Sequence, residues 1–264
     1  MAGRIRTDRE GALGWIVFDH AERRNAVSAE MWRQVPEAVA ALERDPGVRV
    51  VLLRGEGEVA FVSGADISEF ERVRTGAAAS QEYEALTERA FRALSELSKP
   101  LIACIHGFCV GGGLAVALTA DLRYAAEDGR FAIPAARLGL GYGEGGLRTL
   151  ERLVGPSATK EILFTARLFD AAEARHLGLV NAVFPKAELE GRVRALAETI
   201  AANAPLTIAA AKRTLREIAR ADGRGGAFDH ATIDAAIRRC FESDDYREGV
   251  RAFLEKRPPE FRGR

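Results

Sequence analysis

Two glycine-containing segments carry the residue types that could hold a negatively charged oxygen atom. Residues 60–67 read A-F-V-S-G-A-D-I, and residues 106–113 read H-G-F-C-V-G-G-G. Glycine has no side chain and tolerates left-handed dihedral angles, so backbone N–H groups in such segments can approach a ligand closely. The second segment also opens a helical stretch, and the free N–H groups and dipole of a helix N-terminus favour negative charge.

Together the two segments could direct two N–H donors at one oxygen atom, as an oxyanion hole does. Each donor of this kind typically contributes about 3–4 kcal/mol of transition-state stabilisation. The alternative is that both segments are simply tight turns between a strand and a helix. The residues by themselves leave both interpretations open.

Both segments follow short apolar runs that we predict to be buried strands. The first follows residues 48–54 and the second follows Leu101–Ile105, while another strand is expected at Leu13–Asp19. Ser28 should cap the helix that lies between the strand at Leu13–Asp19 and the strand at residues 48–54. Strands that are buried on both faces and separated by helices predict an α/β fold with a mostly parallel sheet packed under helices.

The chain becomes helical after residue 186, and this change predicts two structural units. We expect a core over residues 1–200 and a C-terminal helical region over residues 201–264. Pro205 should start a helix of this region. Asp245 followed by Glu248 has the spacing of a capping box at the start of another.

Composition excludes several classes of function. The 38 Lys and Arg residues balance the 38 Asp and Glu residues, so no overall field attracts nucleic acid or an anionic membrane. No signal peptide is evident, and no run approaches the ~18 apolar residues of a membrane span. The odd number of cysteines, three, and their spacing fit neither a disulfide framework nor a metal site. We expect a reduced, cytoplasmic protein without a bound metal.

The two glycine segments resemble the paired signature of the crotonase (enoyl-CoA hydratase/isomerase) superfamily, whose usual forms read A-F-C-A-G-A-D-I and N-G-x-x-x-G-G-G. The resemblance covers most of the chain, and it rests on the order of many segments rather than on any single one. The further matching segments are Arg24-Asn25-Ala26, Leu138-Gly139-Leu140, Gly145-Gly146, residues 171–180 and residues 248–257.

The resemblance implies a fold, an assembly and a ligand. The fold would be a crotonase-like spiral of β-β-α units in two stacked sheets. The C-terminal helical region would form trimers, often paired into hexamers. The ligand would be an acyl-CoA thioester, so coenzyme A would belong to the substrate and no separate cofactor would be needed.

Site residues follow from the resemblance position by position. The backbone N–H groups of Ala65 and Gly112 would form the oxyanion hole and hold the thioester oxygen as it gains enolate character. Arg24 would meet a CoA phosphate, and Lys256 and Phe261 would close over the nucleotide from the same or a neighbouring subunit. An ordinary surface charge is the alternative for both cations. The other expected contacts to the acyl-CoA are Ala26, Ala60, Asp66, Ile67, Gly111, Pro134 and Tyr142.

Two catalytic positions of the family's hydratases are occupied by alanine in this chain. Those enzymes use one glutamate three residues after the middle glycine of the triple-glycine run, and another directly after a proline twenty residues further on. Here the positions are Ala115 and Ala135, the second following Pro134, so the spacing is preserved. A group that accepts and returns a proton contributes ~10²–10⁴-fold to rate. A methyl group cannot do this, so hydratase chemistry is not expected.

Glu144 is the candidate for a relocated base. The family usually has proline and small residues in this loop, which lines the acyl pocket, and several relatives place a catalytic carboxylate on or beside it. A carboxyl group in an apolar pocket has a raised pKa, which suits a general base near neutral pH. The alternative is that Glu144 points to solvent or lies at the start of the following helix. Tyr142 is a second candidate, as a proton donor or as a wall of the pocket.

Three functions remain open at this point. The first is an enzyme that acts on a CoA thioester through an enolate, by isomerisation, decarboxylation or hydrolysis. The second is a non-catalytic acyl-CoA-binding protein, which would explain both alanines without a role for Glu144. The third is RNA binding, against which the net charge of zero argues.

Overall fold

Two sheets form the core of the molecule in the computed structural model, which describes residues 2–69, 76–224 and 228–264. The larger sheet has the strand order β1-β2-β3-β5-β7-β10, and the smaller has the order β4-β6-β8-β9. Neighbouring strands are parallel except for β1 with β2 and β8 with β9. The strands are β1 Arg4–Glu10, β2 Leu13–Asp19, β3 Val50–Gly55, β4 Ala60–Val62, β5 Leu101–Ile105, β6 Phe108–Val110, β7 Leu122–Ala126, β8 Arg130–Ala132, β9 Phe169–Asp170 and β10 Ala182–Phe184.

Successive strands alternate between the two sheets before a helix follows. Strand β3 of the larger sheet leads to β4 of the smaller sheet and then to α3, and the same order recurs in β5-β6-α4 and in β7-β8-α5. The chain is therefore a spiral of β-β-α units, which confirms the predicted fold. The α-helices are α1 Ala29–Arg44, α3 Ala77–Glu96, α4 Gly112–Thr119, α5 Ala135–Leu138, α6 Glu144–Thr165, α7 Ala171–His176, α8 Leu189–Ala201, α9 Pro205–Arg224, α10 His230–Glu242 and α11 Asp244–Glu255.

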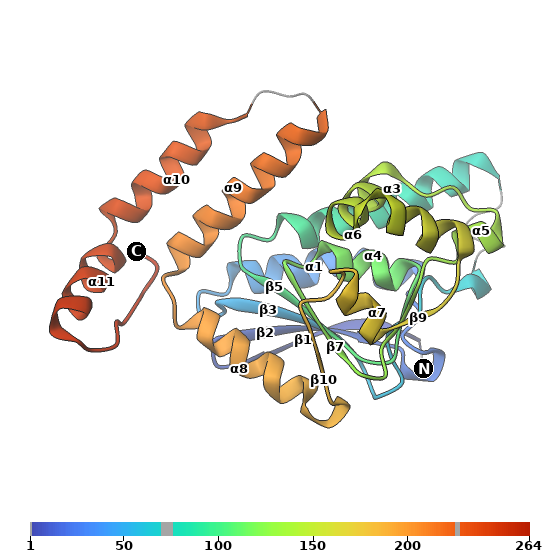
Figure 1. Ribbon diagram of the computed structural model, residues 1–264, viewed down its shortest axis with the longest axis horizontal. Helices are drawn as coiled ribbons and strands as arrows, with labels where there is room; N and C mark the ends of the chain where they lie inside the picture. Colours follow the sequence, from blue (N-terminus) through green and yellow to red (C-terminus); the bar gives the residue numbers. More distant parts are fainter. Residues whose placement is uncertain (1, 70–75, 225–227) are drawn as a thin grey trace.

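The central strands are apolar throughout because helices cover both faces of the larger sheet (Figure 1). In β3, Val51 and Leu53 belong to the core formed with α1, α3 and α4. Val50 and Leu52 alternate with them and pack with α8 on the opposite face. This alternation is the period of two expected for a strand.

Several predicted elements agree with the structure, and one cap does not. Strands β2 and β5 have the predicted bounds, and the Ser28 hydroxyl accepts a hydrogen bond from the Met31 N–H at the start of α1. The capping box at Asp245 is wrong. Ser243 caps α11 by accepting from the Tyr246 N–H, while the Asp245 carboxylate accepts from the N–H groups of Arg262 and Gly263.

Helices α9, α10 and α11 form a tail that extends away from the two sheets (Figure 1). A buried ammonium group ties its first helix to the core. Lys212 Nζ donates to Asp121 Oδ2 at 2.6 Å and to the Lys99 carbonyl at 2.7 Å. Burial lowers the pKa of Lys212, and the Asp121 carboxylate opposes that shift. Of the helices that the structure describes, none has the length and apolar character to cross a membrane.

Candidate active site

Asn25 fixes the conformation of the loop before the first glycine segment. It is fully buried and lies in the left-handed region with φ of 56°. Its side-chain oxygen accepts from the His20 N–H at 2.9 Å. Its amide nitrogen donates to the carbonyls of Glu56 at 2.9 Å and Ala60 at 2.8 Å. These three bonds hold the loop against the start of β4.

The Ala65 N–H is directed away from the backbone pairing of its own segment. Val27 and Ala65 form an isolated parallel bridge. In this bridge the Val27 N–H donates to the Gly64 carbonyl at 2.8 Å, and the Asp66 N–H donates to the Val27 carbonyl at 2.9 Å. Both bonds go to the residues that flank Ala65. Its own N–H therefore faces the other side, with no backbone acceptor among the described residues.

The Gly112 N–H lies beside it. Gly112 is the first residue of α4, where a helix leaves its N–H groups without intrahelical partners. A Cβ atom added at Gly112 would lie 3.5 Å from the Ala65 nitrogen, and one added at Gly64 would lie 3.9 Å from the Gly112 nitrogen. The two glycine segments thus bring both predicted donors together at one place.

The neighbouring glycines have a different role, because they admit close backbone packing. A Cβ atom at Gly113 would lie 1.9 Å from the Val62 carbonyl oxygen, and one at Gly107 would lie 1.9 Å from that of Val59. Gly111 has φ of 54°, which favours glycine, and its N–H donates to the Ala132 carbonyl at 2.8 Å. Only Gly112 of these has both an ordinary φ and space at its Cβ position.

The two alanines lie at the beginnings of the helices that follow the glycine run and β8. Ala115 is in the first turn of α4, and Ala135 is the first residue of α5. Pro134 precedes it, and its Cδ atom would lie 3.8 Å from a Cβ atom at Gly111. Both alanines are half-buried, and Ala135 packs against the main core. The structure thus places small apolar side chains at both positions.

Glu144 does not have the apolar surroundings expected for a relocated base. Its side chain is 77% exposed and forms an ion pair with Arg148 one turn further along the helix. Glu144 is the first residue of α6, where a carboxylate interacts favourably with the helix dipole. This placement corresponds to the alternative considered from the sequence, and the expectation of an apolar pocket around the carboxylate is wrong for the isolated chain.

Tyr142 points inward, unlike its neighbour in the same loop. Its hydroxyl is buried and has no hydrogen-bond partner among the described residues. Burial, and to a lesser degree the nearby Cys109, raises the pKa of Tyr142 to about 12, so the hydroxyl keeps its proton at neutral pH. A Cβ atom at Gly146 would lie 2.9 Å from the Tyr142 ring, so this glycine gives the ring its space. The chain holds an unused hydrogen-bond donor here.

Asp66 stabilises the first glycine segment through its side chain. Its carboxylate accepts from Arg23 Nη1 at 3.0 Å, from the Ser68 hydroxyl at 2.7 Å and from the Ser68 N–H at 3.1 Å. Burial alone would raise the pKa of Asp66, but the bonds from Ser68 and the charge of Arg23 together hold it below its usual range. Ile67, the next residue, is 65% exposed and faces solvent.

The remaining predicted contacts divide between the loop beside the site and the tail. The Arg24 guanidinium lies over the Phe108 ring at 5.0 Å, and the Ala26 carbonyl contacts His20 Nδ1 at 2.9 Å. The Ala60 side chain is buried, and its carbonyl is taken by Asn25.

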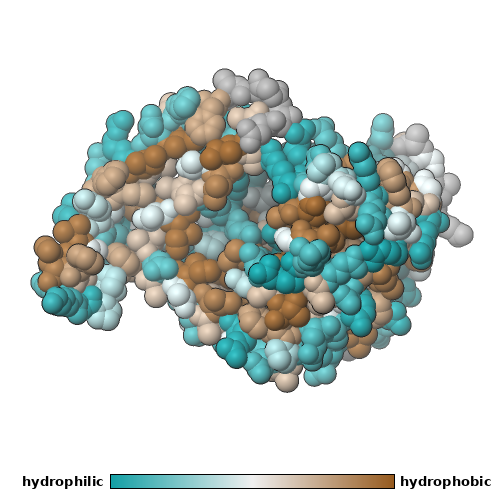
Figure 2. Space-filling view, in the orientation of Figure 1, coloured by the Kyte–Doolittle hydropathy of each residue, from teal (hydrophilic) through white to brown (hydrophobic). Residues whose placement is uncertain are grey.

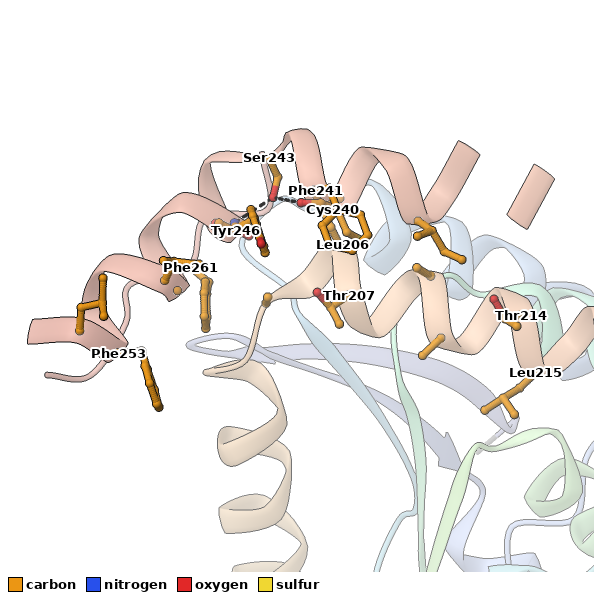
Figure 3. A pocket seen from close by; sticks show the side chains of 18 residues that line it. Leu206, Thr207, Thr214, Leu215, Cys240, Phe241, Ser243, Tyr246, Phe253 and Phe261 are labelled. Carbon is orange, nitrogen blue, oxygen red and sulfur yellow. Dashed lines mark hydrogen bonds between the residues drawn. The ribbon is translucent and has the colours of Figure 1, made fainter. Parts of the chain in front are cut away.

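Lys256 and Phe261 lie on the tail, and the Phe261 carbonyl accepts a hydrogen bond at 2.5 Å from Arg49, which directly precedes β3. Lys256 is exposed at the end of α11, and Phe261 lines an apolar hollow of about 890 Å³ formed by α9, α10 and α11. Figure 3 shows Thr207, Tyr246, Phe253 and Phe261 directed toward the same side of this hollow. This hollow is on the tail, and neither Ala65 nor Gly112 lines it.

Aromatic residues beside the site were missed in the sequence. Trp32 Cζ2 would lie 3.5 Å from a Cβ atom at Gly112, and its indole N–H donates to the Tyr83 hydroxyl at 3.0 Å. Trp32 follows Met31 on α1, whose buried residues Met31, Trp32, Val35 and Val39 recur at helical spacing. Its burial was therefore predictable, although its position at Gly112 was not.

No metal centre competes with this site among the described residues. They contain no group of three or more His, Cys, Asp or Glu side chains that could hold an ion. Cys104 and Cys109 are buried thiols whose pKa burial raises, to about 12 for Cys104. They therefore stay protonated and act as small apolar residues.

Comparison with known proteins identifies the family. The family model described as enoyl-CoA hydratase/isomerase matches residues 8–264. This chain belongs to the enoyl-CoA hydratase/isomerase family. It is 34% identical to the short-chain-enoyl-CoA hydratase of Clostridium acetobutylicum, with 95% of this chain and 94% of that protein covered.

Other members of the enoyl-CoA hydratase/isomerase family that resemble the chain differ in their named activities. The peroxisomal Delta(3,5)-Delta(2,4)-dienoyl-CoA isomerase of Arabidopsis thaliana is 31% identical, with 97% of this chain and 95% of that protein covered. A crystal structure of a family protein from Hyphomonas neptunium superposes with a TM-score of 0.92 at 39% identity, with 98% of each chain covered. The family is thus shown, whereas the relatives do not agree on one reaction.

Proposed function

We propose that this protein is an enzyme that acts on an acyl-CoA thioester through an enolate held by the N–H groups of Ala65 and Gly112. The observation that carries the proposal is the convergence of these two donors, with a Cβ position at Gly112 only 3.5 Å from the Ala65 nitrogen. An oxygen atom placed between them gains two hydrogen bonds that strengthen as it becomes negative.

The reaction proposed is isomerisation, decarboxylation or hydrolysis rather than hydration. Hydration requires one group to activate water and another to deliver a proton to carbon. Alanine at positions 115 and 135 supplies neither. Decarboxylation needs little beyond stabilisation of the enolate, and isomerisation needs one group that carries a proton.

The Tyr142 hydroxyl is the proton donor that we propose for this site. It is buried, protonated at neutral pH and without a partner in the part of the chain that the structure describes, and such a group gains most from an acceptor that a ligand supplies. Glu144 remains the candidate base suggested by the family, although its exposure favours a role at the start of α6.

The assembly proposed is a trimer, or a hexamer of two trimers, in the cytoplasm. The region over 201–264 would make the trimer contacts, and the core over 1–200 would bind the acyl-CoA. The apolar residues exposed along the tail support this proposal (Figure 2). In such an assembly Lys256 and Phe261 would reach a neighbouring subunit's nucleotide, while Arg24, Ile67 and the loop at 60–67 would meet the CoA bound to their own chain.

The alternative proposal is an acyl-CoA-binding protein without catalysis. The two alanines and the exposed Glu144 favour it, because each removes a proton carrier from the site. Both proposals require acyl-CoA to bind, so turnover distinguishes them.

The experiment is to incubate the protein with enoyl-, β-keto- and malonyl-type CoA thioesters and to follow products by mass spectrometry. Glu144→Gln is assayed alongside. We expect turnover of at least one substrate, with Glu144→Gln within about threefold of the native rate. A loss of ~10²-fold or more would make Glu144 the base. No turnover, with binding confirmed by calorimetry, would select the non-catalytic protein.

A further inference from the structure

An aromatic pair, Trp32 on α1 and Tyr83 on α3, lies next to the paired N–H groups. Trp32 on α1 is 1% exposed, and its Cζ2 atom would lie 3.5 Å from a Cβ atom at Gly112. The same Cβ position is 3.5 Å from the Ala65 nitrogen. The indole ring is therefore next to the place where the thioester oxygen would be held.

The indole ring is fixed in this orientation by its partners. Its N–H donates to the hydroxyl of Tyr83 on α3 at 3.0 Å, and both side chains are buried. The Phe91 ring packs edge-on against Trp32, with 5.2 Å between ring centroids. Rotating the indole away would break a buried hydrogen bond and an aromatic contact, so the ring is a rigid surface.

A hollow of about 660 Å³ borders the Tyr83 member of this pair. Tyr83 lines it together with Ala29 and Leu86, and the charged residues Arg33 and Arg89 also border it. Tyr83 thus contacts Trp32 with its hydroxyl and the hollow with its surface. A chain extending from the paired N–H groups toward this hollow would meet the two aromatic side chains first.

We infer that Trp32 and Tyr83 limit the substrate to a short acyl group, of the acetyl to butyryl class. The inference rests on the proposed function, because it places the thioester carbonyl at Ala65 and Gly112. A short group places few atoms beyond the carbonyl, so it need not displace the indole ring. A longer chain would have to displace a hydrogen-bonded, close-packed ring, and dense packing makes such displacements costly.

The test is calorimetric binding of free CoA and of its acetyl, butyryl, octanoyl and dodecanoyl thioesters to the native protein. Burial of each methylene strengthens binding about fourfold. We expect this gain from acetyl to butyryl, and no further gain or a loss at octanoyl. A fourfold gain per methylene that continues through octanoyl would overturn the inference, and this measurement requires no variant.

Variants then test whether Trp32 and Tyr83 set the limit on acyl-chain length. We expect Trp32→Leu to strengthen octanoyl-CoA binding at least tenfold while butyryl-CoA changes less than threefold. Tyr83→Phe keeps the aromatic ring but removes the hydrogen bond to the indole. It should therefore also strengthen octanoyl-CoA binding, but by less than Trp32→Leu does. Trp15→Leu is the matched control, because Trp15 is equally buried but packs on the opposite face of the larger sheet. An unchanged chain-length profile in both folded variants would contradict the inference.

Failure of the proposed function would look different. If no thioester binds more tightly than free CoA, then the carbonyl is not held at Ala65 and Gly112, and the proposed function fails first. If short thioesters bind and long ones bind with the full methylene gain, only the limit set by Trp32 and Tyr83 fails.

Discussion

At the residue scale, Ala115 and Ala135 occupy the positions where the resemblance to the family's hydratases would place two glutamates. Their positions lie beside the glycine run and Pro134, so the scaffold for two glutamates is present without the carboxylates. We expect hydration of crotonyl-CoA to be at least ~10²-fold slower than in a family hydratase that has both glutamates. Loss of absorbance of the enoyl thioester measures this. Equal rates in the two enzymes would show that the alanines do not matter.

The Tyr142 hydroxyl can be tested by stability and by turnover. A buried hydroxyl without a partner costs about 1–3 kcal/mol, so Tyr142→Phe should raise the free energy of unfolding by about 1 kcal/mol in urea. If the hydroxyl donates a proton to the substrate, the same variant should lose ~10²-fold or more in turnover. A more stable variant with native turnover would exclude the proton-donor role.

Asp66 shows how an acidic residue can hold a loop without taking part in the reaction. Because its pKa is depressed in the folded protein, its contribution to stability is present above the unfolded pKa of about 3.9 and is lost as pH falls through the folded value. We expect Asp66→Asn to be less stable than the native protein at pH 7. The difference should shrink as pH falls below about 4, as measured by urea unfolding.

Asp8→Asn is the control for that experiment, because the Asp8 side chain is 41% exposed and forms a surface ion pair with Arg6. It should unfold as the native protein does at both pH values. An Asp66→Asn deficit that does not change with pH would assign the effect to lost hydrogen-bond geometry rather than to charge.

At the scale of elements, the sequence predicted most of the buried strands and helices, but few of the turns and helix ends. The bounds of β2 and β5 were predictable because apolar runs between polar residues are the direct signature of buried strands. Ser28 was recognisable as an N-cap by its own chemistry. At Asp245 the same reasoning failed, since the carboxylate binds N–H groups of Arg262 and Gly263, which come later in the chain.

The orientation of side chains in loops is the part of the site that the sequence did not predict. Tyr142 and Glu144 lie two residues apart in one glycine-rich stretch, and the Tyr142 hydroxyl is buried while the Glu144 side chain is exposed. Glycines leave the direction of such side chains undetermined by local pattern. Trp32 is the converse case, because its burial follows from helical spacing whereas its contact with Gly112 depends on tertiary packing. We expect the size of the acyl pocket to depend on residues 70–83 and on the loop around Tyr142, and residues 70–75 of that range lie outside the described residues.

At the scale of the whole molecule, the tail of α9, α10 and α11 leaves large apolar side chains uncovered in a single chain. Phe253 is 83% exposed and Leu254 74%, on a tail whose hollow is almost wholly apolar. Exposed apolar patches of this kind mark protein contacts. We expect light scattering to give three or six times the 28.6 kDa chain mass, and Leu254→Glu to lower it. Val59→Glu, which places the same charge on the core, should leave the mass unchanged, and a native mass of one chain would refute the assembly.

The most direct test of the oxyanion hole is Gly112→Ala. The backbone at Gly112 accepts alanine, and the added Cβ would lie at an ordinary 3.5 Å from its neighbours, so the variant should fold. The methyl group would nevertheless occupy the space beside the Ala65 N–H. Gly191→Ala, a helical glycine with open space around it, is the matched control.

The measurement is the ultraviolet spectrum and affinity of bound acetoacetyl-CoA, whose enolate absorbs where the keto form does not. We expect the native protein and Gly191→Ala to increase the enolate band on binding. Gly112→Ala should lose the band and bind acetoacetyl-CoA more weakly, because the methyl group keeps the enolate oxygen from the Ala65 N–H and such a donor contributes about 3–4 kcal/mol. A folded Gly112→Ala protein with native affinity and a native enolate band would contradict the assignment of Ala65 and Gly112 as the groups that hold the enolate.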